Sequence, residues 1–288
     1  MQQRNLLGIA ATIGAGANMM SSDAVARAVM ADLPLGEVIA VRAVVAALIL
    51  AAAGLVQAQL RWHPGIVSLP VILRILGEIG ASMFFVSALV HMPVANAAAI
   101  LQFIPLVTTL AAAWLFHERV GWRRMLAALA GFIGVLLILK PGMAGFTWWS
   151  LLAIGAMACM SARDLATSRI DRSVPTLLIG TVSAVCAALA GAALMTTTTY
   201  VPPTPHDLAR LVGAGVLLAM GFICLVVAMR NAEMSAIAPF RYFTLLWAIL
   251  IGYFVWGEVP DVPAWAGIAI VVGAGLYAFA RERRLARE

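Results

Sequence analysis

The chain has 288 residues, of which 63% are hydrophobic and only 11% are charged, with 19 basic and 13 acidic residues and a net charge of +6. A soluble domain carries about 25% charged residues, and a single soluble core cannot bury so large an apolar share without leaving a surface that aggregates. The composition therefore excludes a soluble enzyme, a secreted module and a disordered chain, and it predicts an integral membrane protein.

Apolar runs between polar or proline breaks predict an all-α fold of ten transmembrane helices. One crossing takes about 20 apolar residues, so ten crossings use about 210 residues and leave no room for a soluble domain. Pro93 divides the longest run into two spans, because residues 68–116 are too long to cross once. Pro105 and Pro239 are predicted to interrupt the fourth and ninth spans. In chain order the predicted spans are Leu6–Met30, Leu35–Leu55, Ser68–Val90, Val94–Phe116, Met125–Leu139, Thr147–Arg169, Thr176–Thr197, Leu208–Met229, Met234–Trp256 and Pro263–Ala280.

The basic residues outside these spans predict how the chain is oriented. Ten spans place both termini on one side of the membrane. If that side is the cytoplasm, it receives twelve Lys or Arg residues and the other side receives only Lys140 and Arg210, which is the asymmetry of the positive-inside rule. Both termini are therefore predicted to be cytoplasmic. The same scatter argues against nucleic acid as a partner, because no single domain gathers the basic residues.

Two halves of the sequence resemble one another. Residues 88–118 align with residues 228–258 at a constant offset of 140, which places Glu118 on Glu258, and Asp23 falls on Asp164 at an offset of 141. We therefore predict two five-helix repeats, residues 1–144 and residues 145–288, within one membrane domain. Because five is odd, the second repeat is inverted in the membrane. Inverted repeats characterise secondary transporters, whose site lies near the midplane between the repeats.

Several segments also resemble a known family. They are residues 101–105 (Leu-Gln-Phe-Ile-Pro), residues 116–119 (Phe-His-Glu-Arg) and the glycine-rich stretches at residues 131–134 and 267–275. With these segments the whole chain resembles the EamA-type branch of the drug/metabolite transporter superfamily, and within it the bacterial YddG-type amino-acid exporters. The resemblance implies ten helices in two inverted repeats and a place in the bacterial inner membrane. It also implies outward transport of small polar metabolites, foremost amino acids.

Charged residues within the predicted spans are the first candidates for functional sites. An unpaired charge at the centre of a bilayer costs about 2.5–3.5 kcal/mol, so each of them needs a partner or a function. Asp23 and Arg27 are four residues apart, as are Arg74 and Glu78, so each pair can meet on one helix face. The depths of these residues in the membrane predict two latches, ion pairs that close the outer and the inner side of the protein in turn. The alternative is that the pairs only neutralise charge so that the helices can insert. The predicted pairings are Asp23 with Arg42 or Arg27 in the outer latch, and Asp164 with Arg163 or Arg241 in the inner latch.

Polar residues nearer mid-depth are predicted to line a substrate cavity, namely Asn18, Glu78, Asn96, Gln102 and Tyr242. An amino acid needs an anionic and a cationic partner, and Glu and Arg side chains within the membrane supply both. Glu78 is also the candidate for proton coupling. The positive charge of the neighbouring Arg74 would oppose this role, because it favours the ionised form of the Glu78 carboxyl. The alternative for the three amide side chains is hydrogen bonding between helices, worth about 0.6 kcal/mol per contact.

The sequence lacks the motifs of ATP-driven or enzymatic chemistry. Its single lysine, Lys140, precedes Pro141, so there is no phosphate-binding loop, and no zinc-protease, Cys-x-x-Cys or serine-hydrolase motif occurs. We therefore predict a secondary transporter with no catalytic residues, metal or cofactor. Two rivals stay open, a membrane enzyme acting on a lipid-linked substrate and a channel. The solute, the coupling ion and the oligomeric state are left open.

Overall fold

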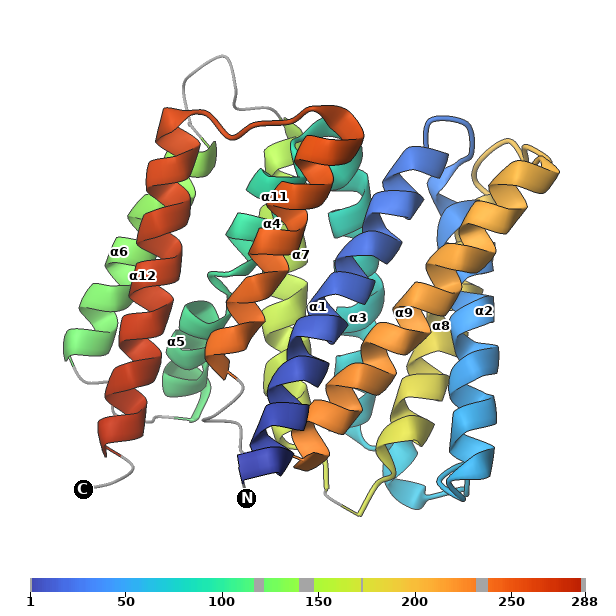
Figure 1. Cartoon of the computed structure of the whole chain (residues 1–288). Coiled ribbons are helices and arrows are strands. Elements are labelled where there is room, and N and C mark those ends of the chain that lie inside the picture. Colours follow the sequence, from blue (N-terminus) through green and yellow to red (C-terminus); the bar gives the residue numbers. More distant parts are fainter. Residues whose placement is uncertain (1, 117–121, 140–147, 172, 232–237, 286–288) are drawn as a thin grey trace.

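The computed structural model is a bundle of helices that run between two ends (Figure 1). It describes all residues except 1, 117–121, 140–147, 172, 232–237 and 286–288, and the described residues contain no strand. The helices of the first half are α1 (Gln2–Val29), α2 (Leu35–Val56), η1 (Pro64–Val67), α3 (Leu69–His91), α4 (Val94–Leu101), α5 (Ile104–Phe116) and α6 (Trp122–Leu139). Those of the second half are α7 (Trp148–Ser168), α8 (Thr176–Met195), α9 (Pro205–Asn231), η2 (Ala238–Tyr242), α11 (Phe243–Trp256) and α12 (Val262–Leu285).

One continuous α-helix covers each of eight predicted spans, with ends that differ by five residues at most. Two other predictions concern residues that the structure does not describe. They are the repeat boundary at residues 144 and 145 and the start of the ninth span at Met234. α1 begins and α12 ends at the same end of the bundle, which we name the terminal end, and the opposite end we name the far end (Figure 1).

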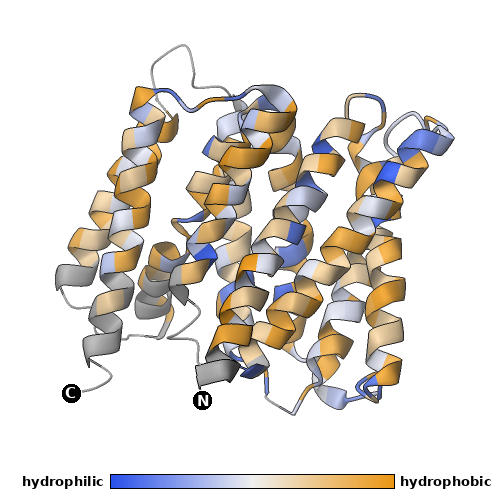
Figure 2. Cartoon of the chain, viewed as in Figure 1, coloured by the Kyte–Doolittle hydropathy of each residue, from blue (hydrophilic) through white to orange (hydrophobic). Residues whose placement is uncertain are grey.

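Hydrophobic residues prevail along most of the helices of the bundle (Figure 2). Large side chains such as Leu48, Leu129 and Leu189 are exposed within helices, where a soluble protein rarely gathers apolar groups into one surface. By length and composition, four helices of the described part of the chain suffice to cross a bilayer, and further apolar helices are shorter. The chain is a multi-pass membrane protein. The four long helices are Leu35–Val56, Leu69–His91, Thr176–Met195 and Pro205–Met229.

Two of the predicted spans are broken. The span predicted at Val94–Phe116 consists of α4 and α5, and the amides of Gln102 and Phe103 at the junction make i to i−3 hydrogen bonds to Ala99 and Ile100. In the second half of the chain, α11 follows directly on the short 3₁₀-helix η2. Pro105 lies in the first turn of α5, where its missing N–H costs nothing. A proline near each break was the sequence signal for these interruptions.

The long helices pack in pairs that join the two halves of the chain. α1 packs on α9, α2 on α8, α3 on α7 and α6 on α12. Glycines permit the close approach. A Cβ atom on Gly36 would lie 2.9 Å from the carbonyl oxygen of Gly191, and one on Gly134 would lie 2.8 Å from that of Gly267. Small residues at such crossings let backbones meet in a bilayer, where van der Waals packing drives helix association.

Two glycines of α12 provide a test of this packing. A Cβ atom on Gly267 would lie 2.5 Å from the Gly134 carbonyl oxygen and 2.7 Å from Cγ1 of Ile138, whereas Gly273 has nothing within 4 Å. Gly267→Leu should therefore lower the free energy of unfolding in detergent by about 1–3 kcal/mol, the usual cost of overpacking. Gly273→Leu is the matched control and should change it little. Equal losses in thermal unfolding curves of the two variants would contradict the α6–α12 crossing.

Candidate functional site

Polar residues recur at every fourth position along one face of α3, at Arg74, Glu78 and Ser82. Each is hydrogen-bonded to a different helix: Arg74 donates to Ser183 Oγ of α8 at 2.8 Å, Glu78 accepts from Arg163 Nη1 of α7 at 3.2 Å, and Ser82 accepts from Arg42 Nη2 of α2 at 2.9 Å. The stripe covers eight residues, or about 12 Å along the helix. α3 therefore connects polar groups at different depths of the bundle.

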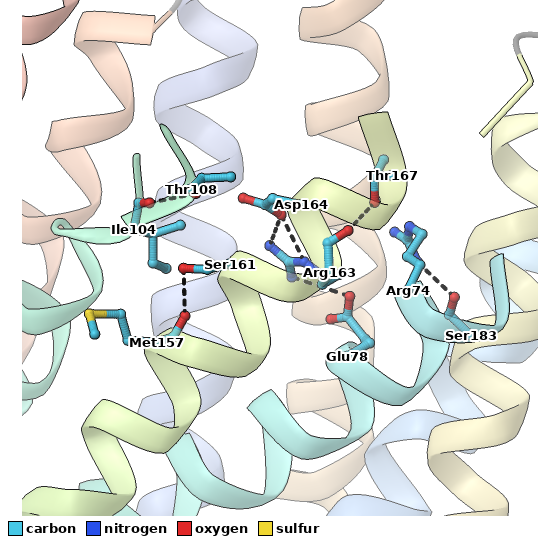
Figure 3. Close-up of polar contacts among 10 residues, drawn as sticks. All are labelled: Arg74, Glu78, Ile104, Thr108, Met157, Ser161, Arg163, Asp164, Thr167 and Ser183. Atoms are coloured by element: carbon cyan, nitrogen blue, oxygen red, sulfur yellow. Dashed lines mark hydrogen bonds and ion pairs between the residues drawn. The ribbon is translucent and has the colours of Figure 1, made fainter. Parts of the chain in front are cut away.

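The part of this stripe nearer the terminal end belongs to a charged cluster, which we define as Arg74, Glu78, Arg163 and Asp164 (Figure 3). Arg163 lies between two carboxylates, with Nη2 2.9 Å from Asp164 Oδ1 and Nη1 3.2 Å from Glu78 Oε2. Arg74 is close enough to interact electrostatically with the other three. Two positive and two negative charges cancel, as groups removed from water require.

Members of the charged cluster are not sealed off. The side chains of Arg163, Asp164 and Glu78 are 21%, 28% and 36% exposed, although Glu78 lies about 14 Å into α3 from its start. The predicted pairing of Asp164 with Arg163 is present in the structure, while Arg241, its other predicted partner, is exposed on η2. Glu78 forms its ion pair with Arg163 of α7, whereas the sequence predicted a pairing with Arg74 on its own helix.

Nearer the far end, Arg42 of α2 pairs with Asp23 of α1, with 2.9 Å between Nη1 and Oδ1. Arg42 is only 3% exposed, and its second nitrogen donates to Ser82 of α3. This is one of the two pairings predicted for the outer latch. All three residues belong to the first half of the chain, so this pair does not by itself hold the two halves together.

A second ion pair near the far end does join the halves. Arg27 of α1 contacts Glu258, which follows α11, with 2.7 Å between Nη2 and Oε1. The other carboxylate oxygen of Glu258 accepts from the backbone N–H of Val94 at 2.9 Å, at the first residue of α4. The guanidinium of Arg27 lies 4.3 Å from the ring centre of Trp256, within cation–π range. We name this set, Arg27, Val94, Trp256 and Glu258, the Glu258 bridge.

A glycine turn aims Glu258 into this bridge. Gly257 ends α11 in the left-handed conformation, with φ of 66°, which glycine adopts without the steric cost of a Cβ atom. The amide of Gly257 bonds to the carbonyl of Tyr253 at 2.9 Å, and that of Glu258 bonds to Gly252 at 3.0 Å. The chain therefore folds back over the last turn of α11, and the carboxylate of Glu258 points to α1 and α4.

Sequence reasoning missed the Glu258 bridge. Of the two partners that the sequence left open for Asp23, Arg42 forms the ion pair, and Arg27 instead pairs with Glu258. Glu258 stood out in the sequence only as the repeat partner of Glu118, which lies outside the described residues. A second buried carboxylate was also missed: Glu37 is 2% exposed and accepts from the backbone N–H of Val201 at 2.8 Å.

The five predicted cavity residues do not form one hydrogen-bonded group in the described part of the chain. Asn18 donates to the carbonyl of Gly14, one turn earlier in α1, at 2.8 Å. Gln102 lies at the junction of α4 and α5, and the hydroxyl of Tyr242 lies against Gly275 of α12. Asn96 of α4 has a buried side-chain oxygen with no partner among the described residues. Glu78 belongs to the charged cluster.

No group of three His, Cys, Asp or Glu side chains placed to hold a metal ion occurs among the described residues. The arrangement instead offers mutually neutralised charges at two depths and a few unpartnered polar atoms. Such an arrangement can bind a polar solute or change its pairing as helices move.

Comparisons with known proteins agree with this description. The sequence profile of the EamA-like transporter family matches residues 5–140 and residues 147–279. The chain is 28% identical to a riboflavin transporter of Vibrio cholerae over 74% of this chain and 70% of that protein. It is 28% identical to an S-adenosylmethionine uptake transporter of Rickettsia bellii, over 67% and 66%. It is 24% identical to the pseudopaline exporter CntI of Pseudomonas aeruginosa, over 65% and 66%.

The fold of the whole chain is also similar to that of one crystal structure. The two share a TM-score of 0.67 over 99% of both chains, with 22% sequence identity. At this identity the likeness concerns the fold alone.

The charge balance of the cluster can be tested through stability. Arg163→Ala leaves Glu78 and Asp164 without the cation between them, and we expect the free energy of unfolding to fall by about 3 kcal/mol. Arg61→Ala, in an exposed loop, is the control. The charge-balanced double variant Arg163→Met, Asp164→Asn, which leaves Arg74 beside Glu78, should recover most of the loss in thermal unfolding. If none of the lost stability is recovered, side-chain packing and not charge balance stabilises this cluster.

Proposed function

Since the chain belongs to the EamA-like transporter family, we propose that it is a secondary transporter that moves a small polar metabolite by alternating access. One observation carries this proposal. The two halves are joined by ion pairs at two depths, Glu78 with Arg163 toward the terminal end and Arg27 with Glu258 at the far end. A protein that opens to each side in turn needs separate contacts of this kind, one for each side.

The finer architecture we propose is ten transmembrane helices in two inverted repeats, residues 1–144 and residues 145–288. The family profile matches the chain in two parts with a gap at residues 141–146. The helix pairs also support it, because exchanging the halves turns the α1–α9 pair into the α7–α3 pair and leaves the α2–α8 and α6–α12 pairs unchanged. In addition, the breaks at Gln102 and Tyr242 are 140 residues apart.

We assign the terminal end to the cytoplasm of a bacterium and place the chain in the inner membrane. The basic residues of the sequence favour this orientation. α1 begins and α12 ends at the same end of the bundle (Figure 1), which agrees with both termini being cytoplasmic. The relatives described above are bacterial proteins.

The charged cluster suggests how the contact between α3 and α7 opens within a membrane. When Glu78 leaves Arg163, Arg163 keeps its partner Asp164 on the same helix, at 2.9 Å. Glu78 has Arg74 four residues earlier on α3, within reach for a new pair. Both helices are therefore neutral when apart, so the halves separate without exposing an unpaired charge to lipid. The Arg74–Glu78 pairing that the sequence predicts belongs, in this mechanism, to the open state.

For the substrate and direction we propose an amino acid or a metabolite containing one, moved outward. Support comes from the acidic and basic side chains at intermediate depth and from the resemblance of the sequence to amino-acid exporters. The relatives broaden the set of solutes to test, because two of them are named for riboflavin and for uptake of S-adenosylmethionine. S-adenosylmethionine itself carries an α-amino acid group. Glu78 is the residue we propose for proton coupling.

Liposomes with purified protein provide the direct test. We expect saturable uptake of labelled L-amino acid or S-adenosylmethionine, accelerated by unlabelled solute inside the liposomes, because a carrier reorients faster when loaded. Unsaturable flux would instead indicate a channel. Absence of flux for amino acids, S-adenosylmethionine and riboflavin alike would overturn the proposal and favour the membrane enzyme. An imposed pH gradient should drive accumulation in the wild type but not in Glu78→Gln.

The exchange of partners predicts how three variants behave in which an uncharged amide replaces a charged side chain. Asp23→Asn and Asp164→Asn should each slow counterflow about tenfold or more, because Arg42 or Arg163 then lacks a partner in one state. Arg74→Gln should do the same by leaving Glu78 unpaired when α3 and α7 separate. The double variant Arg74→Gln, Glu78→Gln should transport faster than Arg74→Gln alone. Normal rates for the two aspartate variants, at equal amounts in the liposomes, would refute the latches.

A further inference from the structure

Unpartnered polar atoms gather where three helices meet. Among the described residues, buried side-chain atoms without a hydrogen-bond partner include Arg27 Nη1, Asn96 Oδ1 and Trp247 Nε1. They lie on α1, α4 and α11, and α11 packs against both of the others. A buried polar atom left unpaired costs about 1–3 kcal/mol, and native proteins contain few of them. Three at one helix junction are therefore available to bind a polar ligand.

The three atoms can be ordered along the bundle axis. α4 begins at the far end and α11 ends there (Figure 1). Val94 and Gly252 mark a shared level, because a Cβ atom on Gly252 would lie 3.8 Å from Cβ of Val94. Asn96 is two residues, or about 3 Å, below that level, and Trp247 is five residues, or about 8 Å, below it. The Glu258 bridge holds Arg27 at the first residue of α4.

The chemistry of the three atoms is complementary to one kind of ligand. Arg27 Nη1 is a charged donor, which a carboxylate satisfies best. Asn96 Oδ1 is an acceptor that needs a donor such as an ammonium group, and Trp247 Nε1 is a neutral donor that needs an acceptor. From the far end inward, the sequence of required groups is therefore a carboxylate, a hydrogen-bond donor and an acceptor.

Resting on the proposed transport function, we propose that Arg27, Asn96 and Trp247 form a subsite for the head group of an α-amino acid. Arg27 binds the carboxylate through Nη1, while Nη2 stays with Glu258 and fixes the guanidinium in place. Asn96 accepts a hydrogen bond from the ammonium group. The ligand side chain extends along α11, where Trp247 donates to an acceptor that it carries.

The charged cluster does not compete for this role in the structure described. No buried side-chain nitrogen or oxygen of the cluster or of the Asp23–Arg42 pair lacks a hydrogen-bond partner in the described part of the chain, whereas Arg27, although paired with Glu258, keeps Nη1 without one. The subsite also discriminates between the solutes named for the relatives. S-adenosylmethionine carries an α-ammonium and an α-carboxylate, and riboflavin carries neither.

The experiment combines truncated ligands with truncated side chains. The probe is the labelled L-amino acid with the largest counterflow in wild-type liposomes, and the inhibitors are its α-deamino analogue and its α-carboxamide. We expect each truncation to weaken inhibition about tenfold, the worth of one hydrogen bond to a charged group. Asn96→Ala should raise KM about tenfold and abolish the preference for the α-amino group, while leaving the preference for the carboxylate. A merely structural role for Asn96 would not remove one preference and keep the other.

Trp247→Phe removes the indole N–H together with part of the ring and should raise KM about fivefold. Asn231→Ala, whose side chain bonds to its own helix at 2.8 Å, and Trp265→Phe, exposed on α12, are the matched controls. If Asn96→Ala and Trp247→Phe keep the wild-type KM, the subsite is wrong although the transport function stands. Transport of riboflavin without transport of any amino acid would likewise overturn the subsite and leave the transport function standing. If either variant does not fold, the truncated ligands test the subsite in the wild-type protein. Equal inhibition by the intact amino acid and by its two truncated analogues would then overturn the subsite.

Discussion

The cost of an unpaired charge in a bilayer is the constraint on which this structure depends. Each ion pair described for the helices joins residues from different helices or from neighbouring positions on one helix, and the charges of each set cancel. Because these pairs must meet, they fix which helices are neighbours and at which depth. The apolar residues around them are interchangeable by comparison, since lipid and protein interior offer similar surroundings to a Leu or Val side chain.

Arg163 shows how a pairing can be firm and still reversible. It holds Glu78 across the contact between α3 and α7, and it also holds Asp164 beside it in its own sequence. A lone pair across two helices would leave two opposite charges behind on parting. Arg163 keeps Asp164 and Glu78 has Arg74 when α3 and α7 separate. The free-energy barrier to separating the two helices is therefore lowered without destabilising the folded bundle. Redundant pairing is therefore a means of making a contact movable in a solvent that tolerates no free ion.

The sequence predicted the course of the chain better than its contacts. Apolar runs marked the helices because the thickness of a bilayer sets their length, and Pro105 marked the break between α4 and α5. The resemblance to the EamA-type transporters is confirmed by the match over both halves, whereas the closer resemblance to amino-acid exporters stays a prediction. Partners were harder to predict, because spacing reveals only neighbours on the same helix. Asp23 was therefore one expected partner of Arg27, whereas its partner in the structure, Glu258, is 231 residues away and is positioned by a turn that follows α11.

That turn has a consequence for how the far end could be adjusted. Gly257 holds a backbone conformation that costs other L-residues about 1–2 kcal/mol, yet it touches none of the charges it serves. Substitution there would shift the direction in which Glu258 points while every ionic group stays in place. Changing an arginine or a glutamate removes a whole interaction, whereas changing this glycine shifts the balance of closed and open forms by a small amount. The stability of the contact at the far end thus depends on two independent quantities. One is the strength of the Arg27–Glu258 ion pair, and the other is the free-energy cost of the backbone conformation at residue 257.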